Sequence, residues 1–150
     1  MCIRDSLRVE ANLDDMNPEL SEHVTDALFA AGAVDVWWTP VTMKRSRPAV
    51  ILSALAPAAA LERVAEVILR ETTSIGLRFD AVERRTLDRR VEMVETPYGP
   101  VAVKVASRQG KVWNVAPEHQ SCRDVARARG VPLKDVYAAA LAAWRRDRPA

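Results

Sequence analysis

Three oxygen-bearing side chains, Asn12, Asp14 and Asp15, follow an alternating apolar stretch near the start of the chain. The alternation over positions 7–11 predicts a strand that ends at this acidic segment. Carboxylates at a strand end could hold a hard divalent cation such as Mg²⁺ or Mn²⁺, which takes oxygen ligands and often shares them with phosphates and water. The same residues could instead form a solvated turn in which aspartate caps the local backbone.

A basic segment with the sequence MKRSRP spans positions 43–48 and carries Lys44, Arg45 and Arg47. Three cations in four positions would suit a polyphosphate, because lysine acts as a point charge and arginine as a planar fork. An ordinary charged hairpin tip has the same composition, and short basic runs are weak motifs. Both interpretations stay open for this segment taken alone.

A third segment, ETTSIG at positions 71–76, offers the hydroxyls of Thr72 and Thr73 together with backbone donors. Turns of this kind can wrap a phosphate or a ribose. The alternative is a helix end followed by a strand, in which Gly76 serves for its backbone freedom. Arg78 and Lys104 are further cations, although arginine on a strand more often faces water than a ligand.

The elements that position these segments follow the order β-α-β-β-α-β. Helices are expected from Asn17-Pro18 and from Pro57, because a polar cap or a proline precedes an apolar helical face. Strands are expected at 34–42, 49–55 and 77–81. This order predicts an α+β protein with a ferredoxin-like unit.

Chain direction through such a unit places three connections on one edge of the sheet. If the first strand runs upward, the acidic segment, the basic hairpin and the threonine-rich turn all lie at the upper ends. Acids and cations brought to one edge favour a site for a phosphate group with its metal ion.

Residues 86–150 predict a small antiparallel β meander followed by C-terminal helices. Turn signals at Pro97–Pro100 and Gly110 separate alternating valine segments, and helices are expected after Pro117 and Pro132. We therefore expect a ferredoxin-like unit at 7–85 and a meander with a helical tail at 86–150. Residues 1–6 fit nothing downstream, and we interpret them as an extraneous leader.

The bulk composition limits the classes of function. The chain has 150 residues, 49% of them hydrophobic and 28% charged, with a net charge of +2. Nonspecific nucleic-acid binding needs a clear basic excess, so no nucleic-acid partner is expected. Two cysteines without a CxxC favour a reducing, cytoplasmic location. No apolar run is long enough to predict a membrane span.

The same segments resemble, in order, the LarC family of pyridinium-3,5-bisthiocarboxylic acid mononucleotide nickel-insertion proteins. The sequence VEANLDDMNPE at positions 9–19 is similar to the family's E-x-N-hydrophobic-D-D-M-x-x-E signature. The matching segments that follow are GAVDV at 32–36, MKRSRP at 43–48, ETTSIGLR at 71–78, PYGPV at 97–101 and Pro117-Glu118 before a helix. Each segment is weakly specific, whereas their order over about residues 7–144 is highly specific.

The resemblance implies a CTP-dependent nickel cyclometallase, an activity of the lyase or metal-chelatase type. Such enzymes place nickel into an organic pincer, a pyridinium bisthiocarboxylate mononucleotide, by forming two sulfur–nickel bonds and one carbon–nickel bond. The product is the nickel-pincer cofactor of lactate racemase. The resemblance further implies that the C-terminal region binds CTP with Mn²⁺ or Mg²⁺ and forms a homo-oligomer.

Residue roles carried over by motif are expectations of the same resemblance. Asp14 and Asp15 would be the metal-side acids, and no residue is assigned a catalytic role. The candidate nucleotide-binding residues are Asn12, Lys44, Arg45, Arg47, Thr72, Thr73, Arg78 and, more weakly, Lys104. Family members also carry a long N-terminal region rich in potential nickel ligands, which this sequence lacks. We therefore expect this chain to bind CTP and a divalent ion without inserting nickel alone.

Two other functions fit the predicted fold. A ferredoxin-like regulatory or RNA-binding module would expose stacking aromatics on central strands, for which Phe79 and the Trp37-Trp38 pair are the candidates. An oligomerisation module without catalysis would have its loop edge covered by another subunit.

Overall fold

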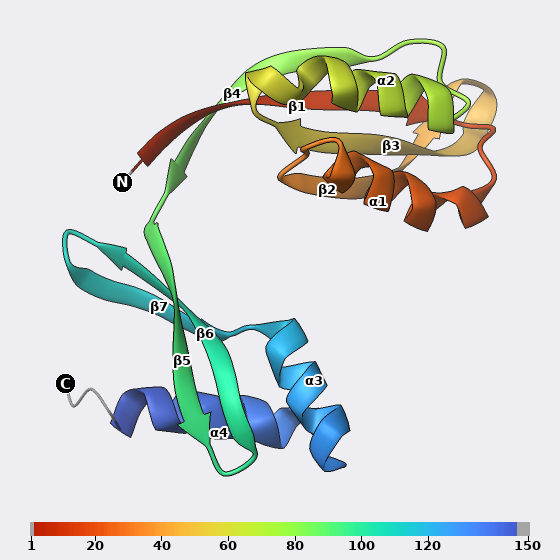
Figure 1. The fold of residues 1–150 in the computed structure, drawn as a ribbon. Helices are drawn as coiled ribbons and strands as arrows, with labels where there is room; N and C mark the ends of the chain where they lie inside the picture. Colours follow the sequence, from red (N-terminus) through yellow and green to blue (C-terminus); the bar gives the residue numbers. More distant parts are fainter. Residues whose placement is uncertain (1, 147–150) are drawn as a thin grey trace. The chain divides into compact units, whose positions relative to one another are not determined.

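A computed structural model describes the backbone of residues 2–146 and the side chains of residues 6–146. The chain divides into two compact units, a first unit of Ile3–Arg84 and a second that begins at Arg85. Within the described residues the first unit has four strands and two α-helices, and the second has three strands and two α-helices, arranged as drawn in Figure 1. The expectation that residues 7–85 bind nucleotide as a domain of their own stays a prediction.

The first unit contains the strands β1 (Cys2–Leu13), β2 (Asp35–Met43), β3 (Arg47–Ala56) and β4 (Arg78–Thr86), with the helices α1 (Ser21–Ala30) and α2 (Leu61–Glu71). Its sheet has the order β2-β3-β1-β4. β3 pairs antiparallel with both β1 and β2. This is the ferredoxin-like arrangement, and the predicted fold class is confirmed.

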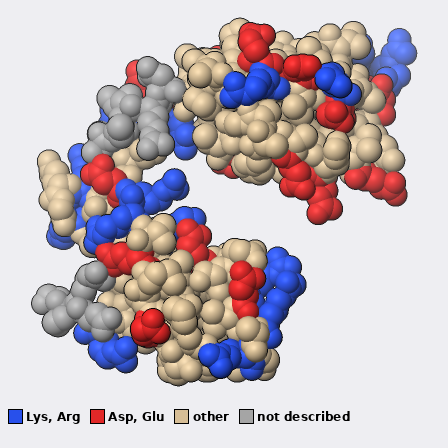
Figure 2. Space-filling model, in the orientation of Figure 1, with Lys and Arg blue, Asp and Glu red and all other residues tan. Residues whose placement is uncertain are grey.

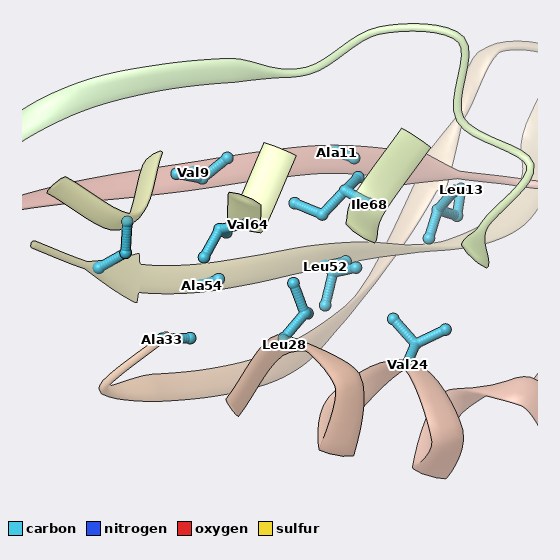
Figure 3. Close-up of a cluster of buried hydrophobic side chains, with 12 residues drawn as sticks. Val9, Ala11, Leu13, Val24, Leu28, Ala33, Leu52, Ala54, Val64 and Ile68 are labelled. Carbon is cyan, nitrogen blue, oxygen red and sulfur yellow. The ribbon is translucent and has the colours of Figure 1, made fainter. Parts of the chain in front are cut away.

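The core of the first unit lies between the sheet and its two helices (Figure 3). Val9, Ala11 and Leu13 of β1 are buried on one face, because successive side chains of a strand point to opposite faces. They pack against the helical side chains Val64 and Ile68, which are fully buried. The polar residues between them, Glu10 and Asn12, are therefore directed to the opposite face of β1, and Asp14 follows the strand directly.

Both helices of this unit begin one turn later than the sequence pattern indicates. Pro18–Leu20 and Ala58–Ala60 form 3-10 turns before α1 and α2. Asn17 caps the first turn as expected, since its side chain accepts a hydrogen bond from the Glu19 amide at 3.1 Å. Trp37 and Trp38 point to opposite faces: Trp38 packs against the core, whereas Trp37 is 37% exposed.

The second unit contains the antiparallel strands β5 (Asp88–Thr96), β6 (Gly99–Arg108) and β7 (Lys111–Pro117), in that order. The helices α3 (His119–Arg129) and α4 (Leu133–Arg146) follow, and Gly130 ends α3 in a left-handed conformation. Val101, Val103 and Val105 of β6 are fully buried in its core. The predicted meander with C-terminal helices is confirmed.

Two features of the chain ends and helices complete the description. None of the helices within residues 2–146 is both long and apolar enough to cross a membrane. β1 begins at Cys2, five residues before the predicted strand start. Met1 and the side chains of residues 2–5 lie outside the described part, and the leader interpretation of residues 1–6 stays a prediction.

Candidate functional site

The three polar connections of the first unit meet at one edge of its sheet. Two hydrogen bonds join them: Arg47 donates to Asp14 at 3.0 Å, and the Thr73 hydroxyl donates to Asp15 at 2.5 Å. A depression with a volume of about 550 Å³ opens beside these contacts. It is lined by Glu10, Asn12, Asp14, Asp15, Thr73, Ser74, Ile75, Gly76, Leu77 and Arg78.

The contacts that bridge these connections define a loop-edge cluster, which consists of Asn12, Asp14, Asp15, Arg47, Thr73 and Arg78. Asp14 is the first residue after β1, and its side chain is 21% exposed. Asp15 is exposed and meets a hydroxyl instead of a cation. Among the described residues, Arg47 is the only ion-pair partner of Asp14.

Arg78 connects β4 to the outward face of β1 through two acceptors. Its guanidinium pairs with Glu10 at 3.0 Å and donates to the Asn12 side-chain oxygen at 2.6 Å. Glu10 in turn accepts a hydrogen bond from the buried Ser53 hydroxyl at 3.0 Å. Glu10 was not among the predicted site residues, although the two-residue period of β1 places it on the same face as Asn12.

Arg8 extends this network away from the depression. Its guanidinium makes two hydrogen bonds to Asp80 of β4, at 3.1 and 3.2 Å. The hydrogen bond to Asp80, followed by the charges of Asp80 and Glu10, raises the pKa of Arg8 above its usual value. Arg8 is thus held by acids of the sheet and stays cationic.

Lys44 and Arg45 lie at the exposed tip of the β2–β3 hairpin. Neither forms an ion pair with any described residue of the chain. Arg45 and the following Ser46 both have positive φ angles, of 60° and 57°. This backbone conformation is costly for residues with a Cβ atom, and nothing in the basic composition of the segment predicts it.

Lys44 and Arg45 do not line the depression, and two further predicted site residues also lie outside the loop-edge cluster. The Thr72 hydroxyl donates to the Ile68 carbonyl at 2.6 Å and accepts from the Ser74 amide at 3.1 Å, so it closes the end of α2 and does not line the depression. Lys104 belongs to β6 of the second unit, where its ammonium pairs with Glu118 at 2.8 Å. The loop-edge cluster is therefore built without either side chain.

The lining includes residues that composition alone does not single out. Ile75 is fully exposed, with a relative accessibility of 103%. Gly76 does not need the left-handed conformation, and a Cβ atom added there would meet nothing within 4 Å. A second hollow of about 250 Å³ shares Asp14 and Asp15 with the first and is otherwise mainly apolar, with Met16, Pro18 and Pro48 in its walls.

The donor set suits a hard divalent ion that arrives with a phosphate ligand. No group of three or more His, Cys, Asp or Glu side chains within the described residues is arranged to hold a metal ion by itself. Asp14 and Asp15 could supply the one or two carboxylates that Mg²⁺ uses when phosphates and water complete its coordination shell. The residues present therefore fit a metal–phosphate complex and do not fit a closed transition-metal centre.

Charges and aromatic residues argue against an RNA-binding surface. Figure 2 shows acidic and basic residues interspersed on the visible face of the first unit, without a broad basic patch. The exposed members of the aromatic set predicted for base stacking, Trp37 and Phe79, belong to β2 and β4, which are the edge strands of the sheet. RNA readers of this fold stack bases on central strands.

A ferredoxin-like unit with acids and cations at its loop edge, joined to a helix-backed β meander, defines the class of this protein. The family model described as nickel insertion protein matches residues 3–137. The chain belongs to the nickel insertion protein family. Thus the membership predicted from the ordered segments is confirmed.

Relatives and a solved structure agree with this assignment. The chain is 41% identical over 131 residues to the pyridinium-3,5-bisthiocarboxylic acid mononucleotide nickel insertion protein of Thermotoga sp. (strain RQ2), covering 87% of this chain and 33% of that protein. It is 42% identical over 133 residues to the protein of the same name from Desulfitobacterium hafniense (strain DCB-2), covering 89% and 33%. The chain thus spans about a third of the length of these curated relatives.

The solved structure is similar over almost the whole of both chains. It is LarC2, described as the C-terminal domain of a cyclometallase involved in the synthesis of the NPN cofactor of lactate racemase. The TM-score is 0.89 at 39% identity, and the match covers 95% of this chain and 99% of that one. A protein of Methanopyrus kandleri AV19 matches with a TM-score of 0.63 at 26% identity, covering 95% and 90%.

Proposed function

We propose that this chain is the CTP- and divalent-metal-binding C-terminal portion of a nickel-inserting cyclometallase that makes the nickel-pincer cofactor of lactate racemase. The observation that carries the proposal is the meeting of Asp14, Arg47, Thr73 and Arg78 beside one depression. The name of the LarC2 structure supports the C-terminal placement, and the names of the relatives support nickel and the pyridinium mononucleotide as substrates.

In this proposal the acids and cations act on different parts of the ligand. Asp14 and Asp15 would hold Mn²⁺ or Mg²⁺, which neutralises and orients phosphate oxygens when bound. Lys44, Arg45, Arg47 and Arg78 would face the triphosphate, and Thr73 would donate its hydroxyl. The fully exposed Ile75 offers an apolar surface at the rim.

Calorimetric titration tests this function directly. The purified chain is titrated with CTP and with ATP, each with and without Mn²⁺, and the titrations are repeated on Lys44→Ala and Asp14→Ala. Removing a charge-assisted phosphate contact should cost about 1.5–3 kcal/mol. Asp124→Ala, on α3 of the second unit, is a matched control because Asp124 contacts Gln120 and no cluster residue. Unchanged CTP binding in both first-unit variants would move the site elsewhere.

The nickel step and self-association belong to the same proposal. We expect the chain alone to bind CTP without nickel-insertion turnover, since the donor sets within the described residues do not form a transition-metal centre. A nickel-transfer assay on the purified chain contradicts this expectation if it shows turnover. Light scattering with and without Mn²⁺ and CTP measures the oligomeric state.

A further inference from the structure

The two arginines of the loop-edge cluster are held in different ways. Arg78 has two separate acceptors, Glu10 and Asn12, and Glu10 is fixed from behind by Ser53. Arg47 makes one hydrogen bond, from a single guanidinium nitrogen to one oxygen of Asp14. The Arg47 side chain is also 51% exposed at the first position of β3. An exposed ion pair with one contact contributes little stability, so Arg47 can change partners easily.

Asp14 is the residue that holds Arg47 in the ligand-free chain. Its only ion-pair partner among the described residues is Arg47, and Asp14 is one of the residues that line the depression beside the cluster. A divalent ion at Asp14 would be repelled by the guanidinium that the same carboxylate holds at 3.0 Å. Arg47 therefore competes with a metal ion for Asp14 while it also carries the charge that a phosphate needs.

We propose that Arg47 is an exchangeable counter-ion that couples metal binding to nucleotide binding. It neutralises Asp14 in the ligand-free chain and transfers to the phosphates when a divalent ion replaces it at Asp14. This inference rests on the proposed function, because it assigns metal and triphosphate to the same cluster. It adds that Arg47 disfavours metal binding alone and favours metal binding with nucleotide.

The exchange predicts unequal effects of removing the guanidinium. In Arg47→Met the Asp14 carboxylate is free, so Mn²⁺ alone should bind about fivefold more tightly, the upper range for one exposed charge pair. With Mn²⁺ present, CTP should bind at least about tenfold more weakly, because a charge-assisted contact is lost. Without Mn²⁺ the loss of CTP affinity should be smaller. In the wild-type chain Arg47 can then reach the phosphates only by breaking its ion pair with Asp14, so it contributes less to CTP binding.

Thermodynamic linkage relates the Mn²⁺ and CTP affinities, so their coupling can be measured even if Mn²⁺ alone binds weakly. The factor by which Mn²⁺ improves CTP binding equals the factor by which CTP improves Mn²⁺ binding. This coupling factor should fall about fivefold in Arg47→Met, in step with the expected gain in affinity for Mn²⁺ alone. It can be measured from the nucleotide side even where Mn²⁺ alone binds too weakly to titrate.

The experiment uses the 150-residue chain, with bound Mn²⁺ followed by the loss of the free-ion electron paramagnetic resonance signal and CTP followed by calorimetry. Arg47→Met is compared with Arg70→Met, a matched control on α2 where Arg70 pairs with Glu66 at 3.2 Å. Arg70→Met should leave both affinities and their coupling unchanged. Circular dichroism checks that each variant retains its fold.

Three results separate the possibilities. A lowered coupling factor in Arg47→Met alone supports the exchange. An unchanged factor together with weaker CTP binding overturns it, because Arg47 would then be a fixed phosphate contact. Absence of CTP and Mn²⁺ binding in the wild-type chain overturns the proposed function itself, and the exchange with it.

Discussion

Within residues 2–146, two hairpins turn through two consecutive left-handed residues, and they differ in the residues that they use. The β6–β7 hairpin has Gln109 and Gly110, with φ angles of 51° and 78°. The β2–β3 hairpin has Arg45 and Ser46, with φ angles of 60° and 57°. Glycine adopts this conformation without a steric penalty, whereas residues with a Cβ atom adopt it only at a cost in free energy.

The difference follows the location of the charges. The β6–β7 hairpin of the second unit places one residue with a Cβ atom, Gln109, at a positive φ angle. The β2–β3 hairpin places two there, carries Lys44 and Arg45, and leads directly into Arg47 of the loop-edge cluster. Backbone strain concentrates where side-chain placement matters for a ligand. We infer that Arg45 and Ser46 are kept at the β2–β3 turn although glycine at these positions would make the fold more stable.

The largest effect on CTP affinity is expected when a cation of the first unit, Arg78, is compared with a cation of the second unit, Lys104. Arg78→Met should weaken CTP binding in Mn²⁺ by about 1.5–3 kcal/mol, because a charge-assisted contact is lost. Lys104→Met should leave that affinity unchanged, since Lys104 is paired with Glu118 in the second unit. Calorimetry on both variants decides the matter. A loss of affinity in Lys104→Met would show that the second unit also contributes to the site.

A smaller effect is expected on stability, where matching substitutions in the two hairpins should change the free energy of unfolding in opposite directions. Ser46→Gly should stabilise the first unit by about 1 kcal/mol, and Gly110→Ser should destabilise the second by a similar amount. Hydrogen exchange of the β3 and β6 amides measures each unit separately. Equal behaviour of the two variants would remove the argument for retained strain. A loss of CTP affinity in Ser46→Gly would link that strain to binding.

The smallest effect on stability is expected at the rim of the depression. Gly76→Ala places a methyl group where no atom lies within 4 Å, so the free energy of unfolding should change by less than about 0.5 kcal/mol. Because Gly76 lines the depression, the same methyl group should weaken CTP binding a few-fold. Urea denaturation and calorimetry on one preparation compare the two quantities. A large loss of stability would mean that Gly76 has a backbone role.

The fold was predictable because its signals are local and repeated. Alternation along β1 and helical spacing in α1 and α2 determine which side chains are buried. Chain direction then brings the loop after β1, the β2–β3 hairpin and the α2–β4 turn to one edge, as the contacts of Asp15 and Arg47 confirm. The location of the polar connections therefore follows from the order of the elements and does not require their contacts to be known.

The partners themselves depend on tertiary distances that a sequence does not carry. Glu10 sits in the pattern of β1 but gains its role from Arg78, 68 residues away. Thr72 and Thr73 are adjacent and chemically identical, yet one closes α2 while the other meets Asp15. The left-handed angles of Arg45 and Ser46 also lack a signal, since glycine or asparagine would normally mark such a turn.

Paramagnetic broadening by Mn²⁺ tests the central claim most directly. Amide spectra of the isotope-labelled chain are recorded with CTP and Mg²⁺, and then with trace Mn²⁺ in its place. The account predicts that signals from residues 12–16 and 72–78, which border Asp14, Asp15 and Thr73, broaden first, while those of Ala54–Ala56 at the opposite end of the same sheet stay sharp. Broadening centred on the second unit, or none at saturating CTP, would contradict a metal–triphosphate site at the loop-edge cluster.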